Sequence, residues 1–200
     1  MTNSTSVPQG YLLEDFRLFH LNDLNSRTYN FHHHDFLKIM ILLSGNVTYV
    51  VEGRSYPLIP WDIVLVDRGQ VHRPVVDTAQ PYERILLYLS PSFLEKYSTK
   101  EASLTKCFET AQYRHSQVLR LSHETLAPIK VLLQKLEANT SCKNNDFASP
   151  LLAKILCLEF LIELNRITLS PKAGFLTEST LDYRISSLLA YINSHLDEPM

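Results

Sequence analysis

Three histidines and one lysine are spaced so that they could bind a ligand together. His32, His34 and Lys38 share one face if residues 31–38 form a β-strand, because strand side chains alternate between faces. His72 follows a glycine turn later in the chain. Neutral imidazoles bind transition metals, and imidazoles beside an ammonium also suit an anionic or polyhydroxylated organic molecule. The remaining interpretation is that these histidines are partly buried, hydrogen-bonded residues without a ligand.

Tyr49, Arg84 and Tyr88 are weaker candidates for the same pocket. Arg84 and Tyr88 have the same strand parity, so both face inward or both face outward. Asp62 stands in a turn-like position, and we expect it to hold the turn by hydrogen bonding rather than to act as an acid. The sequence has no nucleophile elbow, no phosphate-binding glycine loop and no paired-carboxylate signature. We therefore predict no catalytic residues and no enzymatic activity.

Short strands separated by glycine turns must position these side chains. Three of the five glycines stand in turn-like triplets: Gly45, Gly53 and Gly69. Runs rich in β-branched and aromatic residues lie at 38–43, 47–51, 63–66 and 82–89. Strands this short at this spacing predict an antiparallel sandwich or barrel.

After Leu89 the residue pattern changes to a helical one. Helices are expected at 91–98, 123–139, 150–168 and 181–196. Two of them begin at a serine followed by a proline, Ser90-Pro91 and Ser149-Pro150, in which the serine would cap the helix. Residues 170–180 contain proline, glycine and serine and predict a linker.

The helix at 150–168 is apolar around a wide arc, so it needs a second packing partner. Its residues Leu152, Ile155, Glu159 and Ile162 make one continuous stripe, because they are spaced at helical intervals. We expect this stripe to form the contact of a homodimer.

The composition limits the class of protein. Hydrophobic residues make up 45%, charged residues 20%, and the formal net charge is −2, so this stretch has no basic surplus with which to bind DNA. The polar segment 1–10 is no signal peptide, and the apolar run 151–164 is too short and too charged to cross a bilayer. The cysteines at 107, 142 and 157 predict neither a disulfide framework nor a zinc site. We expect a cytoplasmic protein.

Two short motifs resemble those of cupins. The spacing His32-x-His34-x3-Lys38-x6-Gly45 is similar to the first cupin motif, in which glutamate usually stands in place of the lysine. Asp67-x-Gly69-x2-His72 resembles the second motif, in which proline usually stands in place of the aspartate. The resemblance implies that the three histidines occupy metal-ligand positions. An ammonium has no lone pair and repels a dication, so we expect neither a metal nor another cofactor.

The order of elements resembles the N-terminal half of AraC-family transcription regulators. The likeness covers the histidine-rich strand, residues 42–75, residues 82–97, the helices, and the ending YRISSLLAYINSHLDEPM. It implies a mainly β fold with α: a cupin-like antiparallel β-barrel (double-stranded β-helix) followed by α-helices. The expected organisation is an effector-binding barrel with an N-terminal arm at 1–90, a helical dimerisation segment at 91–169, a linker at 170–180, and the first helix of a truncated helix-turn-helix DNA-binding domain at 181–200.

The function that this resemblance implies is sensing of a small-molecule effector, a sugar or an anionic metabolite, by a homodimer. DNA would be bound only through the missing C-terminal domain, and no membrane is involved. A buried ammonium needs an anion, so we expect either Asp67 or the effector itself to neutralise Lys38. Two alternatives remain: a metal-dependent cupin enzyme, such as an isomerase or dioxygenase, and a dimerisation module whose barrel is filled by its own side chains.

Overall fold

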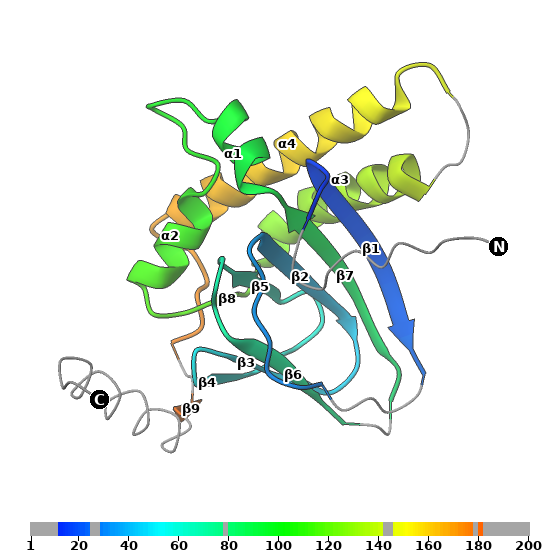
Figure 1. The fold of residues 1–200 in the computed structure, drawn as a ribbon. Helices are drawn as coiled ribbons and strands as arrows, with labels where there is room; N and C mark the ends of the chain where they lie inside the picture. Colours follow the sequence, from blue (N-terminus) through cyan, green and yellow to red (C-terminus); the bar gives the residue numbers. More distant parts are fainter. Residues whose placement is uncertain (1–11, 25–28, 78–79, 142–145, 178–179, 182–200) are drawn as a thin grey trace, which may run out of the picture.

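A computed structural model describes residues 12–24, 29–77, 80–141, 146–177 and 180–181 (Figure 1). The N-terminal arm expected at 1–10 and nearly all of the helix expected at 181–196 lie outside the described residues. Among the described helices, none has both the length and the apolar character that a membrane span requires.

Two antiparallel sheets form the first part of the fold, as predicted. One has the strand order β1-β7-β2-β5-β8 and the other the order β6-β3-β4-β9. The strands are β1 (Phe16–Asp23), β2 (Leu37–Ser44), β3 (Val47–Val51), β4 (Arg54–Pro57), β5 (Ile63–Val66), β6 (His72–Val76), β7 (Tyr82–Leu89), β8 (Val118–Leu119) and β9 (Thr180–Leu181). The turn at Gly45 requires a glycine. Its φ is 112°, and a side chain there would press on the backbone of Pro81.

Helices follow the barrel and cover the outer face of the five-stranded sheet (Figure 1). They are α1 (Pro91–Tyr97), α2 (Lys106–Tyr113), α3 (His123–Ser141) and α4 (Ser149–Leu169). Ser90 caps α1 as expected, because its hydroxyl accepts a hydrogen bond from the backbone N–H of Phe93 at 3.1 Å. The cap expected from Ser149 is wrong: α4 begins after Ala148, which has a φ of 61° and makes no side-chain capping bond. The fold is therefore a cupin-like barrel followed by helices.

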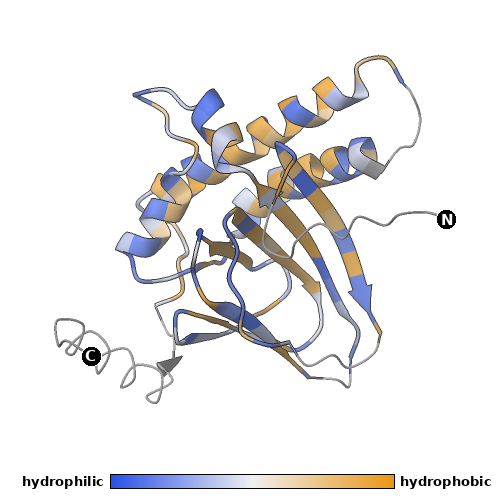
Figure 2. Ribbon diagram, in the orientation of Figure 1, coloured by the Kyte–Doolittle hydropathy of each residue, from blue (hydrophilic) through white to orange (hydrophobic). Residues whose placement is uncertain are grey.

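Strand β2 is buried on both faces, and this decides where its side chains point. Ile39 and Ile41 belong to the core between the sheet and the helices, whereas Met40 and Leu42 belong to the core between the two sheets. Figure 2 shows the strand as apolar along most of its length. Lys38 has the parity of Met40 and Leu42, so it faces the space between the sheets, here called the lumen.

A buried asparagine joins α2 to α4. Asn165 accepts a hydrogen bond from the backbone N–H of Cys107 at 2.7 Å, and its amide donates to the carbonyl oxygens of Leu104 and Leu161 at 3.1 and 2.7 Å. The bonds to Cys107 and Leu104 satisfy backbone groups at the start of α2 and in the loop before it that would otherwise be buried without partners. Cys107 and Cys157 are buried free thiols.

Asp62 holds its turn, as expected, and also forms an ion pair. Its carboxylate accepts a hydrogen bond from the backbone N–H of Ile59 at 2.9 Å. Arg120 donates two further bonds to it at 2.9 and 2.7 Å. The carboxylate is thereby fully used for structure, which agrees with a role in the fold rather than in acid catalysis.

The segment expected as a linker is packed against the barrel in its described part. The backbone N–H of Arg120 donates to the carbonyl oxygen of Gly174 at 2.9 Å, and the N–H of Leu176 donates to Val118 at 3.0 Å. A side chain at Gly174 would collide with the backbone of Arg120. Leu181, expected to begin the last helix, instead lies in β9 and pairs with Arg54 of β4. Main-chain pairing with two strands has overridden the local linker and helix preferences.

Candidate functional site

The residues expected in the pocket come together from several strands on the lumen side of the barrel. Lys38 of β2 is 6% exposed and His72 of β6 is fully buried. The Lys38 Nζ and His72 Nε2 atoms are 3.2 Å apart. The His72 ring centroid lies 4.2 Å from that of His32 and 4.9 Å from that of His34. Sequence spacing thus identified a real spatial cluster, here called the lumen cluster.

Residues 31–38 do not form the continuous strand that would place His32, His34 and Lys38 on one face, although these side chains come together in another way. His32 forms only an isolated bridge with His72, and the chain bends at Asp35 and Phe36 before β2 begins. The bend is closed by His34, whose Nδ1 bonds the carbonyl oxygen of Phe36 at 2.7 Å and whose ring stacks on the Phe36 ring at 4.0 Å. His32 is consequently exposed at the edge of the cluster, while His34 is buried.

Backbone carbonyls fix the tautomers of the three histidines. Nδ1 of His32 faces the carbonyl of Asn30 at 3.0 Å, and Nδ1 of His72 faces that of Gln70 at 3.0 Å; His34 is bound in the same way. A carbonyl only accepts, so each Nδ1 carries the proton and each Nε2 keeps a lone pair. The Lys38 amine therefore donates to His72 Nε2.

Burial keeps the histidines neutral. Burial and the charge of Lys38 lower the pKa of His34 to about 4 and that of His72 to about 2. The pKa of His32 is lowered for the same leading reason, burial. Around neutral pH the cluster therefore offers imidazole lone pairs to hydrogen-bond donors, rather than imidazolium charges to anions.

Two buried polar atoms in the cluster have no hydrogen-bond partner among the described residues: His34 Nε2 and the Tyr49 hydroxyl. The Tyr49 ring is stacked 6.0 Å from His72, and the Lys38 ammonium lies 5.8 Å from the centre of that ring. Burial raises the pKa of Tyr49 well above its usual value, so its hydroxyl stays protonated. Unsatisfied buried polar atoms are costly, and here a bound molecule with polar groups would satisfy them.

Arg84 and Tyr88 both face the lumen. Their strand parity alone had left open whether they face inward or outward. The Tyr88 ring lies 4.6 Å from Phe36 and 6.1 Å from His34, so Tyr88 forms a wall of the lumen cluster. Arg84 is buried but engaged elsewhere: it forms an ion pair with Asp23 at 2.8 Å and donates to the carbonyl of Tyr82 at 3.1 Å. The sequence does not identify Asp23 as its partner, because the two residues are far apart in the chain and come together only through the pairing of β1 with β7.

Asp67 does not neutralise Lys38, so the structure rules out the aspartate as one of the two expected partners. Its carboxylate accepts hydrogen bonds from the Gln112 amide at 2.8 Å and from the backbone N–H of Arg68 at 2.7 Å. These bonds direct Asp67 toward α2. Within the described residues Lys38 has no ion pair, and its one hydrogen bond goes to His72. Burial and the neighbouring charge of Arg84 lower the pKa of Lys38 to about 7.

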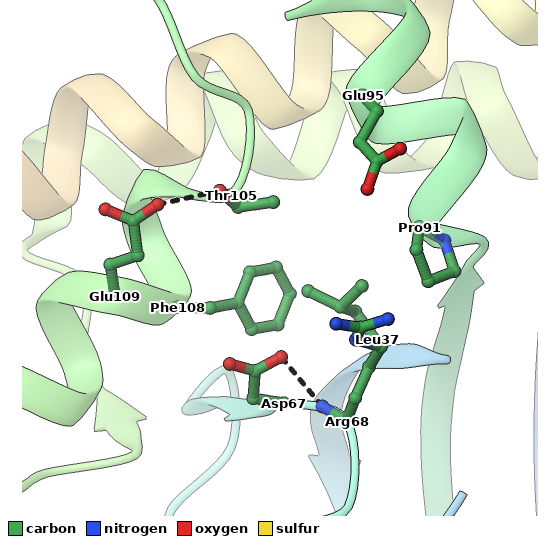
Figure 3. A pocket seen from close by; sticks show the side chains of 8 residues that line it. All are labelled: Leu37, Asp67, Arg68, Pro91, Glu95, Thr105, Phe108 and Glu109. Atoms are coloured by element: carbon green, nitrogen blue, oxygen red, sulfur yellow. Dashed lines mark hydrogen bonds between the residues drawn. The ribbon is translucent and has the colours of Figure 1, made fainter. Parts of the chain in front are cut away.

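Asp67 instead lines a groove between the barrel and the first two helices, with a volume of about 230 Å³ (Figure 3). Its lining residues are Leu37, Asp67, Arg68, Pro91, Glu95, Thr105, Phe108 and Glu109. Figure 3 shows three carboxylates around an apolar floor formed by Phe108 and Leu37. Sequence reasoning missed this groove because α2, which supplies part of it, was not predicted. No unpartnered buried polar atom of the described residues belongs to it.

A metal does not fit the lumen cluster. In the described part of the chain, no group of three His, Cys, Asp or Glu side chains is arranged to hold a metal ion. The lone pair of His72 Nε2 is already engaged by Lys38, and Lys38 stands where the carboxylate ligand of a metal site would be needed. The arrangement suits hydrogen bonding to an organic molecule.

The stripe expected to form the dimer contact lies on the outer surface of α4. Leu152 is 44%, Ile155 51% and Ile162 42% exposed, and Glu159 between them is also exposed. The opposite side of α4 packs on α2, α3 and the sheet. Helical spacing therefore separated the outer face correctly from the core face.

Comparison with known proteins adds a family match. The model of the family described as AraC-like ligand binding domain matches residues 16–161. That match begins at the first residue of β1 and ends within α4, so it includes the lumen cluster. No curated protein matches the chain.

Some solved structures resemble parts of the fold at low identity. A salicylate 1,2-dioxygenase from Pseudaminobacter salicylatoxidans is 20% identical over 37% of this chain and 22% of its own, with a TM-score of 0.35. A Cupin 2 conserved barrel domain protein from Salinispora arenicola CNS-205 is 18% identical over 45% of this chain and 76% of its own, with a TM-score of 0.36. Vicilin from Corylus avellana is 20% identical over 40% of this chain and 22% of its own, with a TM-score of 0.36. The chain thus spans about a fifth of the dioxygenase's length.

Proposed function

We propose, for a chain that belongs to the family of AraC-like ligand-binding domains, that its barrel senses a small organic molecule and thereby regulates transcription. The ligand binds in the lumen at Lys38, His34 and His72, with Tyr49 and Tyr88 beside it and His32 at the edge. Arg84 has a supporting role, because its charge acts on Lys38 while its hydrogen bonds go to Asp23 and Tyr82.

The observation that carries this proposal is the set of buried polar atoms in the lumen cluster. His34 Nε2 and the Tyr49 hydroxyl have no partner among the described residues, and Lys38 is buried without a carboxylate. A barrel that served only as a dimerisation module would fill this space with apolar side chains, since each unsatisfied polar group costs about 1–3 kcal/mol. The polar groups are explained if a ligand supplies their partners.

The second part of the proposal is that two copies associate through α4. Three half-exposed apolar side chains lie in one stripe of this helix. The stripe runs along α4 from Leu152 to Ile162. A continuous apolar stripe of this kind matches its own copy in a two-fold contact, which favours a second copy as the occupant.

Regulation then follows from linkage. A ligand shifts the balance between two arrangements of the dimer only by its different affinity for each. DNA is bound by a C-terminal helix-turn-helix domain of the longer regulator, in the cytoplasm, and not by this region. A metal-dependent cupin enzyme is the competing function, and Lys38 in the acidic ligand position is the observation against it.

The test is a thermal-shift screen of the purified chain with aldoses, ketoses, 2-oxo acids, hydroxybenzoates and hydroxybenzaldehydes. A compound that binds the lumen raises the melting temperature of the unchanged chain and of Glu95→Gln, but not of His34→Ala. Glu95 lines the groove of Figure 3, so it is the matched control for the other concave site. Shifts that survive His34→Ala and vanish with Glu95→Gln would move the ligand site to the groove.

Elemental analysis tests the competing enzyme function. The chain should be purified without a metal-affinity column, and no stoichiometric metal is expected. One equivalent of nickel, zinc, iron or manganese, lost when His32 and His72 are replaced, would contradict the sensing proposal and favour the enzyme.

A further inference from the structure

Lys38 has the surroundings of a nucleophilic amine rather than of an ordinary charged lysine. Its side chain is 6% exposed, and its Nζ atom bonds a neutral imidazole nitrogen, His72 Nε2, at 3.2 Å. The titratable and charged groups around it are His32 and His34 before β2, Tyr49 of β3, His72 of β6, and Arg84 and Tyr88 of β7. None of these is a carboxylate, so nothing in this set holds the amine in its charged form.

We propose that the lumen recognises an aldehyde or a ketone, and that Lys38 captures it as a reversible imine. This inference rests on the proposed function, because it names the ligand class of the same site. It goes further in making the recognition covalent: the signal is a bond to one lysine rather than a set of hydrogen bonds.

The first support is the amount of free amine. Desolvation and a neighbouring cation are the two ways in which proteins activate a lysine for imine formation, and Lys38 has both, through burial and through Arg84. With a pKa of about 7, about three quarters of Lys38 is uncharged at pH 7.5, against about one in a thousand for an exposed lysine.

The second support is the position of His72 as a proton carrier. The Lys38 nitrogen adds to the carbonyl carbon, and the carbonyl oxygen takes up a proton to give a carbinolamine. The C–O bond then breaks as the C=N bond forms, and the two hydrogens of the amine leave with the oxygen as water. His72 Nε2, which accepts a hydrogen bond from the Lys38 nitrogen, orients the amine and relays its proton to the departing hydroxyl without holding it as an imidazolium. The step needs no oxidant or reductant.

The third support is the polarity of the surrounding wall, which also indicates the rest of the ligand. His34 Nε2 is an acceptor without a donor, and the Tyr49 hydroxyl has no partner among the described residues. Phe36 and Tyr88 add aromatic faces next to His34. A carbonyl compound that also carries a hydroxyl would satisfy the orphaned atoms, and 4-hydroxybenzaldehyde has these features.

The experiment treats the purified chain with 4-hydroxybenzaldehyde and sodium cyanoborohydride at pH 7.5 and maps the reduced adducts by peptide mass spectrometry. The chain has lysines at 38, 96, 100, 106, 130, 135, 143, 154 and 172. Lys38 should be labelled at least about tenfold faster than any other lysine, a lower bound because nucleophilicity also falls with pKa. Lys38→Arg should remove the fast adduct, and Lys154→Arg, a surface control, should not. Lowering the pH to 6 should slow labelling of Lys38 about eightfold.

A second probe separates failure of the imine from failure of the binding site. 4-Hydroxybenzyl alcohol has the same ring and hydroxyl but cannot form an imine. If alcohol and aldehyde raise the melting temperature equally and Lys38 is not labelled, the imine is refuted and the lumen site stands. Labelling spread over the lysines according to their exposure would also refute the imine. If neither probe changes the melting temperature and no selective adduct forms, the imine is refuted and binding of this class of ligand in the lumen fails with it.

Discussion

Replacing Ile155 of α4 by aspartate should convert the proposed dimer to a monomer without unfolding it. Ile155 is 51%, Leu152 44% and Ile162 42% exposed. Full burial of such a side chain is worth about 1.5–3 kcal/mol, so covering the exposed halves of these three contributes about 1 kcal/mol each, or about 6 kcal/mol in two copies. That sum is comparable to the low end of the free energy lost on association. The dimer therefore needs the burial of all three side chains.

The substitution acts on both copies at once. It removes about 2 kcal/mol of apolar burial and places two carboxylates in the contact without partners, which costs several kcal/mol more. A total of about 5 kcal/mol raises the dissociation constant more than a thousandfold. The monomer itself should lose less than about 1 kcal/mol, because substitutions at exposed positions change stability little.

Sedimentation equilibrium over a range of protein concentrations is the assay, with circular dichroism to verify the fold. Tyr113→Asp is the matched control, since Tyr113 is an exposed apolar residue at the end of α2, and it should leave the dimer intact. A folded monomer for the unchanged chain, or an Ile155→Asp chain that dimerises normally, would refute the reasoning. An unfolded Ile155→Asp chain would contradict the 51% exposure of Ile155, on which the estimated loss of dimer stability is based.

Three further predictions concern stability, each measured by urea denaturation. Arg120→Ala should destabilise the fold by about 3 kcal/mol, because it leaves the buried Asp62 carboxylate without its cation; Arg120→Lys should recover part of this, and no loss would mean that the pair is dispensable. Asn165→Leu should cost about 2 kcal/mol, because it orphans buried backbone groups of α2 and the preceding loop; unchanged stability would contradict that junction. Acidification from pH 7.5 to 5 should cost about 2–4 kcal/mol, since His34 and His72 have folded pKa values of about 4 and about 2 and so take up protons only on unfolding, below about pH 6.5. His72→Gln should roughly halve this loss, and an equal loss in that variant would show that other groups cause it.

Local patterns gave correct answers where one interaction dominates a position. The strands at 47–51, 63–66 and 82–89 are confirmed to the residue. The side chains of 63–66 and 82–89 alternate between the two cores, and every second residue of 47–51 enters the core between the sheets. The outer stripe of α4 follows from helical spacing alone. The cluster of His32, His34, Lys38 and His72 could also be predicted, from strand alternation and from the resemblance of the two motifs to those of cupins.

The errors arise where particular contacts, rather than residue periodicity, decide the path of the backbone. The bend before β2 depends on the stacking of His34 on Phe36 and on a side-chain bond to the backbone, and no residue period reports such a contact. Asp67 turns to Gln112 of α2, a helix that a short and mostly polar sequence did not reveal. The segment after α4 is held by the edges of β8 and β4, although its composition is that of a linker.

The position of Lys38 on β2 suggests a route by which ligand binding in the lumen affects the helices. Lys38 faces the lumen, and the adjacent residue Ile39 packs in the core shared with the helices, so the same strand is a wall of both compartments. The neighbouring β1–β7 edge is tied to α3 by His20, whose ring bonds Glu83 of β7 at 2.8 Å and Glu137 of α3. Close-packed interiors transmit displacement. A movement of Lys38 must therefore be accommodated either by the side chains of the lumen or by the packing of α3 and α4 on the sheet. If the lumen binds a ligand as proposed, the shared wall of β2 predicts that binding alters the packing of α3 and α4, and with it the exposed stripe of α4.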